Sequence, residues 1–129
     1  MRAGAPDGTI GDVSPSVLIV DDHDEFRASA RALLEDAGFE VVGEAADGAE
    51  ALTAVAALWP DIVLLDVQLP GEDGFAVAEQ LARIPDPPAV VLISSRDAAA
   101  YGPRLVGTSA RGFLPKIALS GETLTALVG

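Results

Sequence analysis

The sequence predicts an α/β fold in which helices cover both faces of an open, doubly wound parallel sheet. Five short apolar runs alternate along the chain with segments of helical periodicity. Three of these runs are almost continuous in Val, Ile and Leu, which is typical of parallel strands buried on both faces. Strand–helix units joined by right-handed crossovers form such a sheet, and its ligands bind at the carboxyl ends of the strands.

The apolar runs place the five expected strands at residues 17–20, 40–45, 62–66, 89–94 and 112–116. Apolar side chains at helical spacing predict a first helix that stops at Gly38; they are Phe26, Ala30, Leu33, Leu34 and Ala37. Asp47 can cap a second helix, which ends before Pro60. A third helix is expected over residues 74–83.

The two remaining helices are less regular in sequence. Residues 96–109 contain Gly102 and Pro103, and a proline inside a helix costs about 3 kcal/mol, so the fourth helix should be short, kinked or mobile. Ser120 can cap a fifth helix, of about two turns, near the end of the chain.

Composition excludes several classes of protein. A chain of 129 residues suits one domain, and no apolar run approaches the roughly 18 residues that span a bilayer. Without cysteine or a secretory signal, a cytoplasmic location is the expectation, and a net charge of −12 disfavours direct binding to nucleic acid or to a membrane. Residues 1–15 are expected to be a disordered leader or an expression remnant, and 16–129 the folded domain.

Polar residues stand where the predicted strands end: Asp21 and Asp22, Asp66, Ser94, and Lys116. Three carboxylates at one edge repel one another unless a cation binds, and oxygen ligands with room for water suit Mg²⁺ or Mn²⁺. A nearby ammonium group and hydroxyl can hold anionic oxygens. This set is what transfer of a phosphoryl group onto a carboxylate would use, with Asp66 as the acceptor.

The motifs around these residues resemble a response-regulator receiver domain of two-component signalling, NarL/LuxR type. They occur in the family's order over residues 17 to about 117: VLIVDDHDEFR, GFEVVGEAADGAEAL, PDIVLLDVQLPGEDGF, AVVLISS and SARGFLPK. The resemblance implies a flavodoxin-like (βα)5 sheet with strand order 2-1-3-4-5 and a short or irregular fourth helix. It also implies that residues 16–129 are a receiver domain, which we expect to be truncated in or after the fifth helix.

The resemblance also implies roles for single residues. Asp66 would be phosphorylated, and Asp22, Asp66 and the backbone carbonyl of Gln68 would bind the metal directly, with Asp21 acting partly through water. Lys116 and Ser94 would bind phosphoryl oxygens. Phe113 would be the aromatic residue of the switch, and Gln68 and Arg96 would influence the lifetime of the phosphoryl group.

The implied partner is a sensor histidine kinase, and a phosphorylation-dependent homodimer is expected. The expected output is transcription regulation through a helix-turn-helix domain that would follow residue 129. Rival hypotheses are a stand-alone receiver and a degenerate receiver that acts as an adaptor. A third is an aspartyl-phosphate hydrolase of the haloacid-dehalogenase kind, which needs a second Asp where this chain has Gln68. We expect no metabolic enzyme activity. His23, the single histidine, is expected to be exposed and without a catalytic role.

Overall fold

The structure, a computed structural model, describes residues 14–128. Residues 1–13, which make up most of the expected leader, lie outside the described residues, so the leader stays a prediction. Among residues 14–128, no helix has both the length and the apolar character that crossing a bilayer requires.

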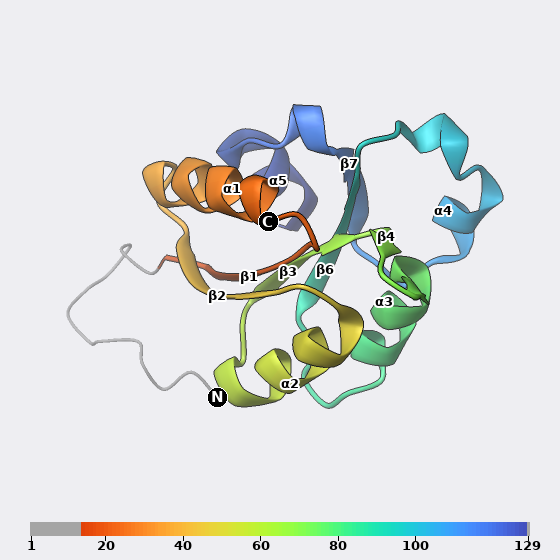
Figure 1. The fold of residues 1–129 in the computed structure, drawn as a ribbon, viewed down its shortest axis with the longest axis horizontal. Coiled ribbons are helices and arrows are strands. Elements are labelled where there is room, and N and C mark those ends of the chain that lie inside the picture. The colour runs from red at the N-terminus through yellow and green to blue at the C-terminus, as the bar shows by residue number, and fades with distance from the viewer. Residues whose placement is uncertain (1–13, 129) are drawn as a thin grey trace.

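A five-stranded parallel sheet forms the centre of the fold, with strand order β2-β1-β3-β6-β7 (Figure 1). Its strands are β1 (Ser16–Val20), β2 (Glu40–Ala45), β3 (Ile62–Asp66), β6 (Ala89–Ser94) and β7 (Gly112–Pro115). Because β6 and β7 are the fourth and fifth strands of this sheet, the predicted order 2-1-3-4-5 is confirmed. The expected fifth strand ends one residue early, since Lys116 begins a short 3-10 turn, η2 (Lys116–Ala118).

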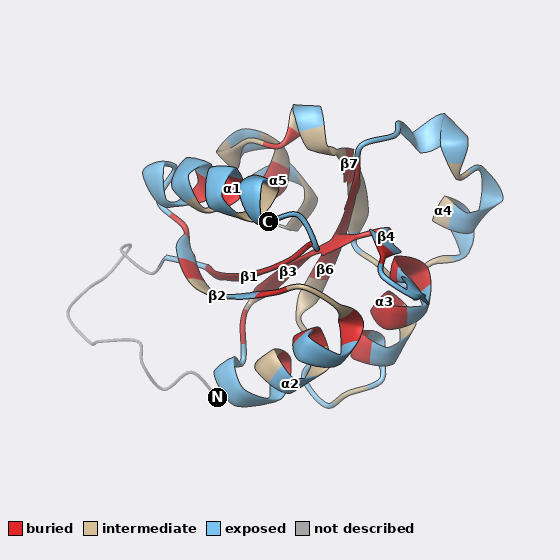
Figure 2. Ribbon diagram, in the orientation of Figure 1, coloured by how far each residue is buried: buried red, intermediate tan, exposed pale blue. Residues whose placement is uncertain are grey.

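Helices lie on both faces of the sheet, as predicted. Figure 1 shows α1 (Asp24–Asp36) and α5 (Gly121–Val128) on one face, and α2 (Gly48–Leu58) and α3 (Gly74–Ala82) on the other. Alternate residues of each strand therefore enter two separate cores. Leu18 and Val20 pack in the core under α2 and α3, whereas Val17 and Ile19 pack in the core under α1 and α5. Figure 2 shows that the three central strands, β1, β3 and β6, are buried along almost their whole length.

Two predicted helix caps are confirmed. The Asp47 carboxylate accepts a hydrogen bond of 2.8 Å from the N–H of Glu50 at the start of α2. Ser120 Oγ accepts one of 3.0 Å from the N–H of Thr123 in α5. These side chains satisfy N–H groups that have no partner inside their own helix.

The segment after β6 is irregular, which also agrees with the sequence. It contains a 3-10 turn, η1 (Ala98–Ala100), and a single short helix, α4 (Pro103–Gly107). Pro103 occupies the first turn of α4, where its missing N–H removes no hydrogen bond. A small antiparallel pair, β4 (Gln68–Leu69) with β5 (Glu72–Asp73), follows β3 and was not predicted, because two-residue strands leave no periodicity in a sequence.

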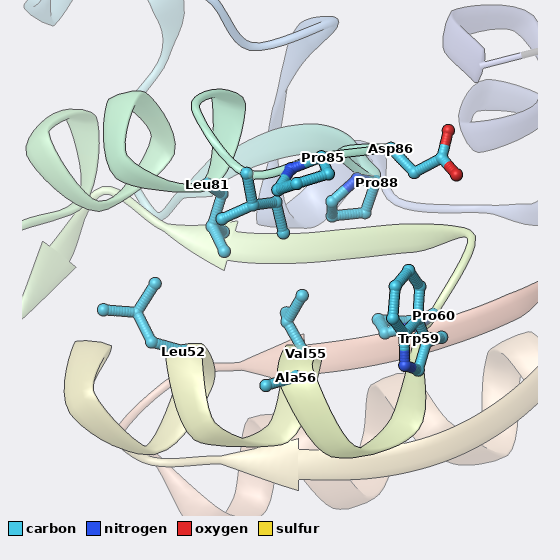
Figure 3. Close-up of a pocket in the computed structure, with 10 residues that line it drawn as sticks. Leu52, Val55, Ala56, Trp59, Pro60, Leu81, Pro85, Asp86 and Pro88 are labelled. Atoms are coloured by element: carbon cyan, nitrogen blue, oxygen red, sulfur yellow. The ribbon is translucent and has the colours of Figure 1, made fainter.

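An apolar hollow lies at the opposite end of the sheet from the strand exits, between α2 and the loop that follows α3 (Figure 3). Its lining residues are Leu52, Val55, Ala56, Trp59, Pro60, Leu81, Ile84, Pro85, Asp86 and Pro88. Trp59 is half exposed there, and its left-handed backbone (φ 51°) ends α2. The only titratable group in this lining is the Asp86 carboxylate, so the chemistry expected at the strand exits does not extend to the hollow.

The turn that leaves β3 requires glycine at position 74. A Cβ atom on Gly74 would lie 2.2 Å from the carbonyl oxygen of Asp66 and 2.7 Å from the Cα of Val67, both backbone atoms.

We therefore expect Gly74→Ala to lower the free energy of unfolding, measured by urea denaturation, by about 1–3 kcal/mol or more. Gly107→Ala is the matched control, because a Cβ atom there meets nothing within 4 Å. The control should change stability by no more than about 0.5 kcal/mol. Equal effects of the two substitutions would contradict this account of the turn.

Candidate functional site

Charged residues from three strand exits meet at one edge of the sheet. Asp21 follows β1, Asp66 is the last residue of β3, and Lys116 follows β7. The parallel register aligns these exits: Asp66 pairs with Ile93 of β6, and Ser94 pairs with Pro115 of β7. The edge predicted from the sequence is therefore a real cluster.

Lys116 bridges two buried carboxylates. Its Nζ lies 2.5 Å from Asp21 Oδ2 and 3.3 Å from Asp66 Oδ2. Asp21 is fully buried and Asp66 is 3% exposed. The same ammonium group lies 4.4 Å from the centroid of the Phe26 ring, a cation–π contact. Without this cation, two negative charges would face each other in a buried site, which is strongly unfavourable.

Backbone groups orient the same carboxylates. The N–H of Gln68 donates to Asp66 Oδ1 at 2.9 Å, and the N–H of His23 donates to Asp21 Oδ1 at 2.8 Å. The Arg27 guanidinium donates to the backbone carbonyl of Asp21 at 2.5 Å. Each carboxylate is thus held by a backbone N–H of the loop that follows its strand.

The two buried carboxyls titrate in opposite directions. Burial raises the pKa of Asp66 to about 6, and the neighbouring Asp21 charge adds to this rise. Burial acts in the same sense on Asp21, but the adjacent Lys116 ammonium group and the hydrogen bond from the His23 N–H outweigh it, so the pKa of Asp21 is lowered. Burial alone would lower the pKa of Lys116, yet the two carboxylates raise it. Lys116 therefore stays protonated, and Asp21 is the more firmly ionised carboxyl.

The residues at this edge fit a divalent cation. Asp21, Asp22, His23 and Asp66 each offer a ligand atom, and these atoms all lie within 4.8 Å of one another. Asp21 Oδ2 is buried and accepts no hydrogen bond of ordinary geometry among the described residues, although Lys116 balances its charge. The Asp22 side chain is partly exposed, which leaves room for water on the ion. Clustered carboxylate oxygens with access to water are what Mg²⁺ and Mn²⁺ require.

His23 is exposed, as expected, but it belongs to this cluster. Its Nδ1 lies 3.0 Å from Asp21 Oδ1 and 3.2 Å from Asp22 Oδ1. The sequence alone did not indicate this contact, because the ring turns back over the carboxylates of the two preceding residues.

The other predicted site residues lie around the cluster without all joining it. Gln68 is exposed and contributes its N–H to Asp66, while Arg96 is exposed and its N–H donates to Ser94 Oγ at 3.0 Å. Ser94 is fully buried. Phe113 in β7 is half-buried. No hydrogen bond joins Ser94 to Asp66 or Lys116 among the described residues.

Tyr101 is a residue of this region that sequence reasoning missed. Its hydroxyl lies 2.5 Å from Ser94 Oγ, and its ring packs against Phe75 and Phe113 with centroid distances of 5.7 Å to each. One signal in the sequence could have drawn attention to it: Tyr101 is the one large apolar side chain in the stretch SSRDAAAYGP (94–103).

Comparisons with known proteins identify the family of this chain. A model of the response regulator receiver domain family matches residues 17–128. Among curated relatives, the chain is 40% identical over 113 residues to "Probable transcriptional regulatory protein NarL" of Mycobacterium tuberculosis, covering 87% of this chain and 52% of that protein. It is 36% identical over 112 residues to response regulator GacA of Pseudomonas viridiflava, covering 86% and 52%. The chain thus spans about half the length of these relatives.

Solved structures show the same fold. The signal receiver domain of NarL from Mycobacterium tuberculosis superposes with a TM-score of 0.77 at 37% identity, covering 90% of this chain and 98% of that one. A two-component response regulator of the LuxR family from Aurantimonas sp. gives a TM-score of 0.77 at 27% identity, covering 88% and 81%.

The raised pKa of Asp66 makes stability depend on pH. The folded protein binds more protons than the unfolded chain between the ordinary value of 3.8 and about 6, so the free energy of unfolding falls as pH rises through this range. Asp66→Asn removes this penalty. In metal-free buffer at pH 7.5, we expect the variant to be more stable than the wild type by on the order of 1–3 kcal/mol, and this gain should vanish below about pH 4.

Urea denaturation from pH 3.5 to 8 with a chelator present measures this difference. Asp47→Asn is the matched control, because asparagine caps α2 as aspartate does and the position lies outside the cluster. A gain from Asp66→Asn that did not depend on pH, or that the control reproduced, would contradict burial of a charged carboxylate as its cause.

Proposed function

The chain belongs to the response regulator receiver domain family, and from this premise we propose that it accepts a phosphoryl group on Asp66. The observation that carries the proposal is the buried Asp66 carboxylate, which shares the Lys116 ammonium group with Asp21 at the carboxyl edge of the sheet. Receiver domains are signalling modules and not metabolic enzymes. In the proposed reaction the protein therefore accepts one phosphoryl group and does not turn over a substrate.

The proposed reaction is one phosphoryl transfer. An oxygen of the Asp66 carboxylate attacks the phosphorus of a phosphohistidine on a sensor histidine kinase, or of a small phosphodonor. The new P–O bond forms as the bond from phosphorus to its leaving group breaks. Attack requires the ionised carboxylate, and with a pKa of about 6 Asp66 is mostly ionised at pH 7.5. Lys116 Nζ, 3.3 Å from Asp66 Oδ2, is placed to bind an oxygen of the acyl phosphate.

Mg²⁺ or Mn²⁺ completes the proposed site. Asp22, Asp66 and the backbone carbonyl of Gln68 would hold the ion directly, and Asp21 would act partly through water. When bound, the ion neutralises charge on the transferring phosphoryl oxygens. The support for this assignment is the cluster of ligand atoms within 4.8 Å, which includes Asp21, Asp22 and Asp66.

Ser94 and Phe113 are the proposed switch residues. Ser94 Oγ would leave its present partners and bind a phosphoryl oxygen, and rotation of the Phe113 ring would accompany that movement. Gln68 and Arg96 flank the site at the loops after β3 and β6 and are proposed to tune phosphoryl lifetime. Their support is contact: the Gln68 N–H bonds to Asp66, and the Arg96 N–H bonds to Ser94.

The proposed output is regulation of transcription, the role that the NarL relative has in its name. We propose that phosphorylation promotes a homodimer and that a helix-turn-helix domain in the same regulator contacts DNA. The receiver itself is an unfavourable partner for DNA or an anionic membrane, because this chain has a formal net charge of −12.

Acetyl phosphate with Mg²⁺ tests the acceptor. Intact mass spectrometry should show one added phosphate on the wild type and none on Asp66→Asn, because the amide cannot act as the nucleophile. Asp47→Asn, the control outside the cluster, should be labelled like the wild type. Labelling of Asp66→Asn would overturn the assignment of the acceptor, and an unlabelled wild type would favour the degenerate adaptor.

Asp22→Ala tests the metal site. Removal of a direct ligand should weaken Mg²⁺ binding, measured by isothermal titration, by tenfold or more, since loss of even an outer-shell partner costs 10–100-fold in comparable sites. Asp36→Ala is the control, because Asp36 is exposed at the far end of α1, away from the cluster. Equal Mg²⁺ affinity in the Asp22→Ala variant and the wild type would remove Asp22 from the ligand set.

A further inference from the structure

Residues 95–107, which follow β6, are attached to the domain at few points, whereas Thr108 and Ser109 beyond them are held by hydrogen bonds to the Glu79 carboxylate. Residues 95–100 are all exposed, and within residues 101–107 only Tyr101 and Leu105 are half-buried. Both pack against the core under α2 and α3. Arg104 adds an exposed attachment, since its guanidinium lies 4.2 Å from the centroid of the Phe75 ring and pairs with Asp73. The position of this segment therefore depends on a small number of side chains.

Tyr101 is the attachment that reaches the functional site. Its ring lies between Phe75 of α3 and Phe113 of β7, with both centroid distances at 5.7 Å and both interplanar angles at 59°. Tilted aromatic contacts of this kind are favourable. The stack holds the Tyr101 ring so that its hydroxyl meets Ser94 Oγ at 2.5 Å.

Ser94 Oγ is held at the β6 exit and not at Asp66. It accepts from the Arg96 N–H at 3.0 Å and shares a hydrogen bond of 2.5 Å with the Tyr101 hydroxyl. Neither Asp66 nor Lys116 is a hydrogen-bond partner of Ser94 among residues 14–128. A movement of Ser94 Oγ to a phosphoryl oxygen on Asp66 would therefore exchange these partners for a new one.

We propose that Tyr101 is a positioning residue that latches Ser94 away from the phosphoryl site and thereby couples phosphorylation to the segment 96–107. This inference rests on the proposed function of Asp66 and Ser94. When Ser94 Oγ moves to a phosphoryl oxygen, the Tyr101 hydroxyl loses its partner, and the segment loses one of its few attachments. The coupling runs through this one contact, so a change at either end alters the other end only if it makes or breaks the Ser94–Tyr101 hydrogen bond. The hydroxyl group that holds Ser94 thus belongs to Tyr101 in the segment 96–107. Phe113 of β7 has no hydroxyl group and contributes only its ring to the packing.

Tyr101→Phe is the sharpest test, since it removes the hydroxyl and leaves the aromatic stack. The first measurement needs no phosphate and follows hydrogen exchange of residues 98–105 by mass spectrometry. The amides of Tyr101, Arg104 and Leu105 form local hydrogen bonds in this range, so their exchange reports how firmly the segment is held. Tyr101→Phe and Ser94→Ala should each raise exchange there by about two- to tenfold, the range expected for one lost hydrogen bond. The double variant should rise no further, because both substitutions remove the same bond. An unchanged exchange rate in Tyr101→Phe would contradict the proposal that Tyr101 holds Ser94. So would a double variant whose rate increase equals the product of the two single increases.

A second measurement tests the coupling through the initial rate of phosphorylation by acetyl phosphate with Mg²⁺. Tyr101→Phe should raise the rate by about two- to tenfold, because Ser94 is released toward the site. In the Ser94→Ala background the same substitution should have no effect. Leu105→Ala is the matched control, since it loosens the segment and leaves the Ser94–Tyr101 contact in place; its rate should stay within about twofold of the wild type.

The outcomes separate the two proposals. A rate increase that persists in the Ser94→Ala background, or that Leu105→Ala reproduces, overturns the coupling and assigns the effect to general loosening. An unchanged rate in Tyr101→Phe overturns it as well. A wild type that gains no phosphate overturns the proposed function and the coupling with it, while hydrogen exchange still decides whether the latch exists.

Discussion

Two carboxylates buried at the end of neighbouring parallel strands are the constraint on which the rest of this site depends. Asp21 and Asp66 face each other at the sheet edge, and the Lys116 ammonium group lies within 3.3 Å of both. Without a cation, one carboxylate would have to take up a proton, because two charges so close together in a buried site repel strongly. The Lys116 charge favours ionisation of Asp21, whereas burial leaves Asp66 with a pKa of about 6.

This electrostatic arrangement explains why other elements have their observed form. The chain turns directly after β3 so that the Gln68 N–H reaches the Asp66 carboxylate, and the antiparallel pair β4–β5 then brings Gly74 back against the backbone of Asp66 and Val67. β7 must end at Pro115 so that Lys116 can reach across two strands. The apolar cores on either face hold these strand ends in register, and the stability of the two cores thus maintains a site that is itself unfavourable for folding.

The arrangement also separates the charged cluster from the segment that follows β6. Asp21, Asp66 and Lys116 lie at the ends of β1, β3 and β7, strands that two packed helix layers hold in place. The segment after β6 is attached by a few side chains, with Tyr101 as the one that contacts Ser94. A small electrostatic change at Asp66 can therefore shift a weakly attached segment without disturbing the sheet. Regions that move in signalling are generally drawn from such low-stability elements.

The sequence by itself determined the sheet, its helices and the residues at the strand exits. Continuous apolar runs predict buried parallel strands, and parallel strands bring their carboxyl ends to one edge, so Asp21, Asp66 and Lys116 could be placed together from their positions in the chain. Local signals such as Asp47 and Ser120 predicted helix starts, because a cap acts within four residues. These inferences succeed because they depend on periodicity and nearest neighbours along the chain.

Only the tertiary structure decided which side chains meet across elements. The contact of Tyr101 with Ser94, the packing of its ring between Phe75 and Phe113, and the turn of His23 over two carboxylates depend on the angles at which loops leave the sheet. The pair β4–β5 is too short to leave a periodic signal. Loop directions follow from the packing of residues distant in sequence, and no local pattern encodes them. The cluster of Asp21, Asp66 and Lys116 could thus be predicted from the sequence, whereas the contact of Ser94 with Tyr101 in the segment 96–107 had to be found in the fold.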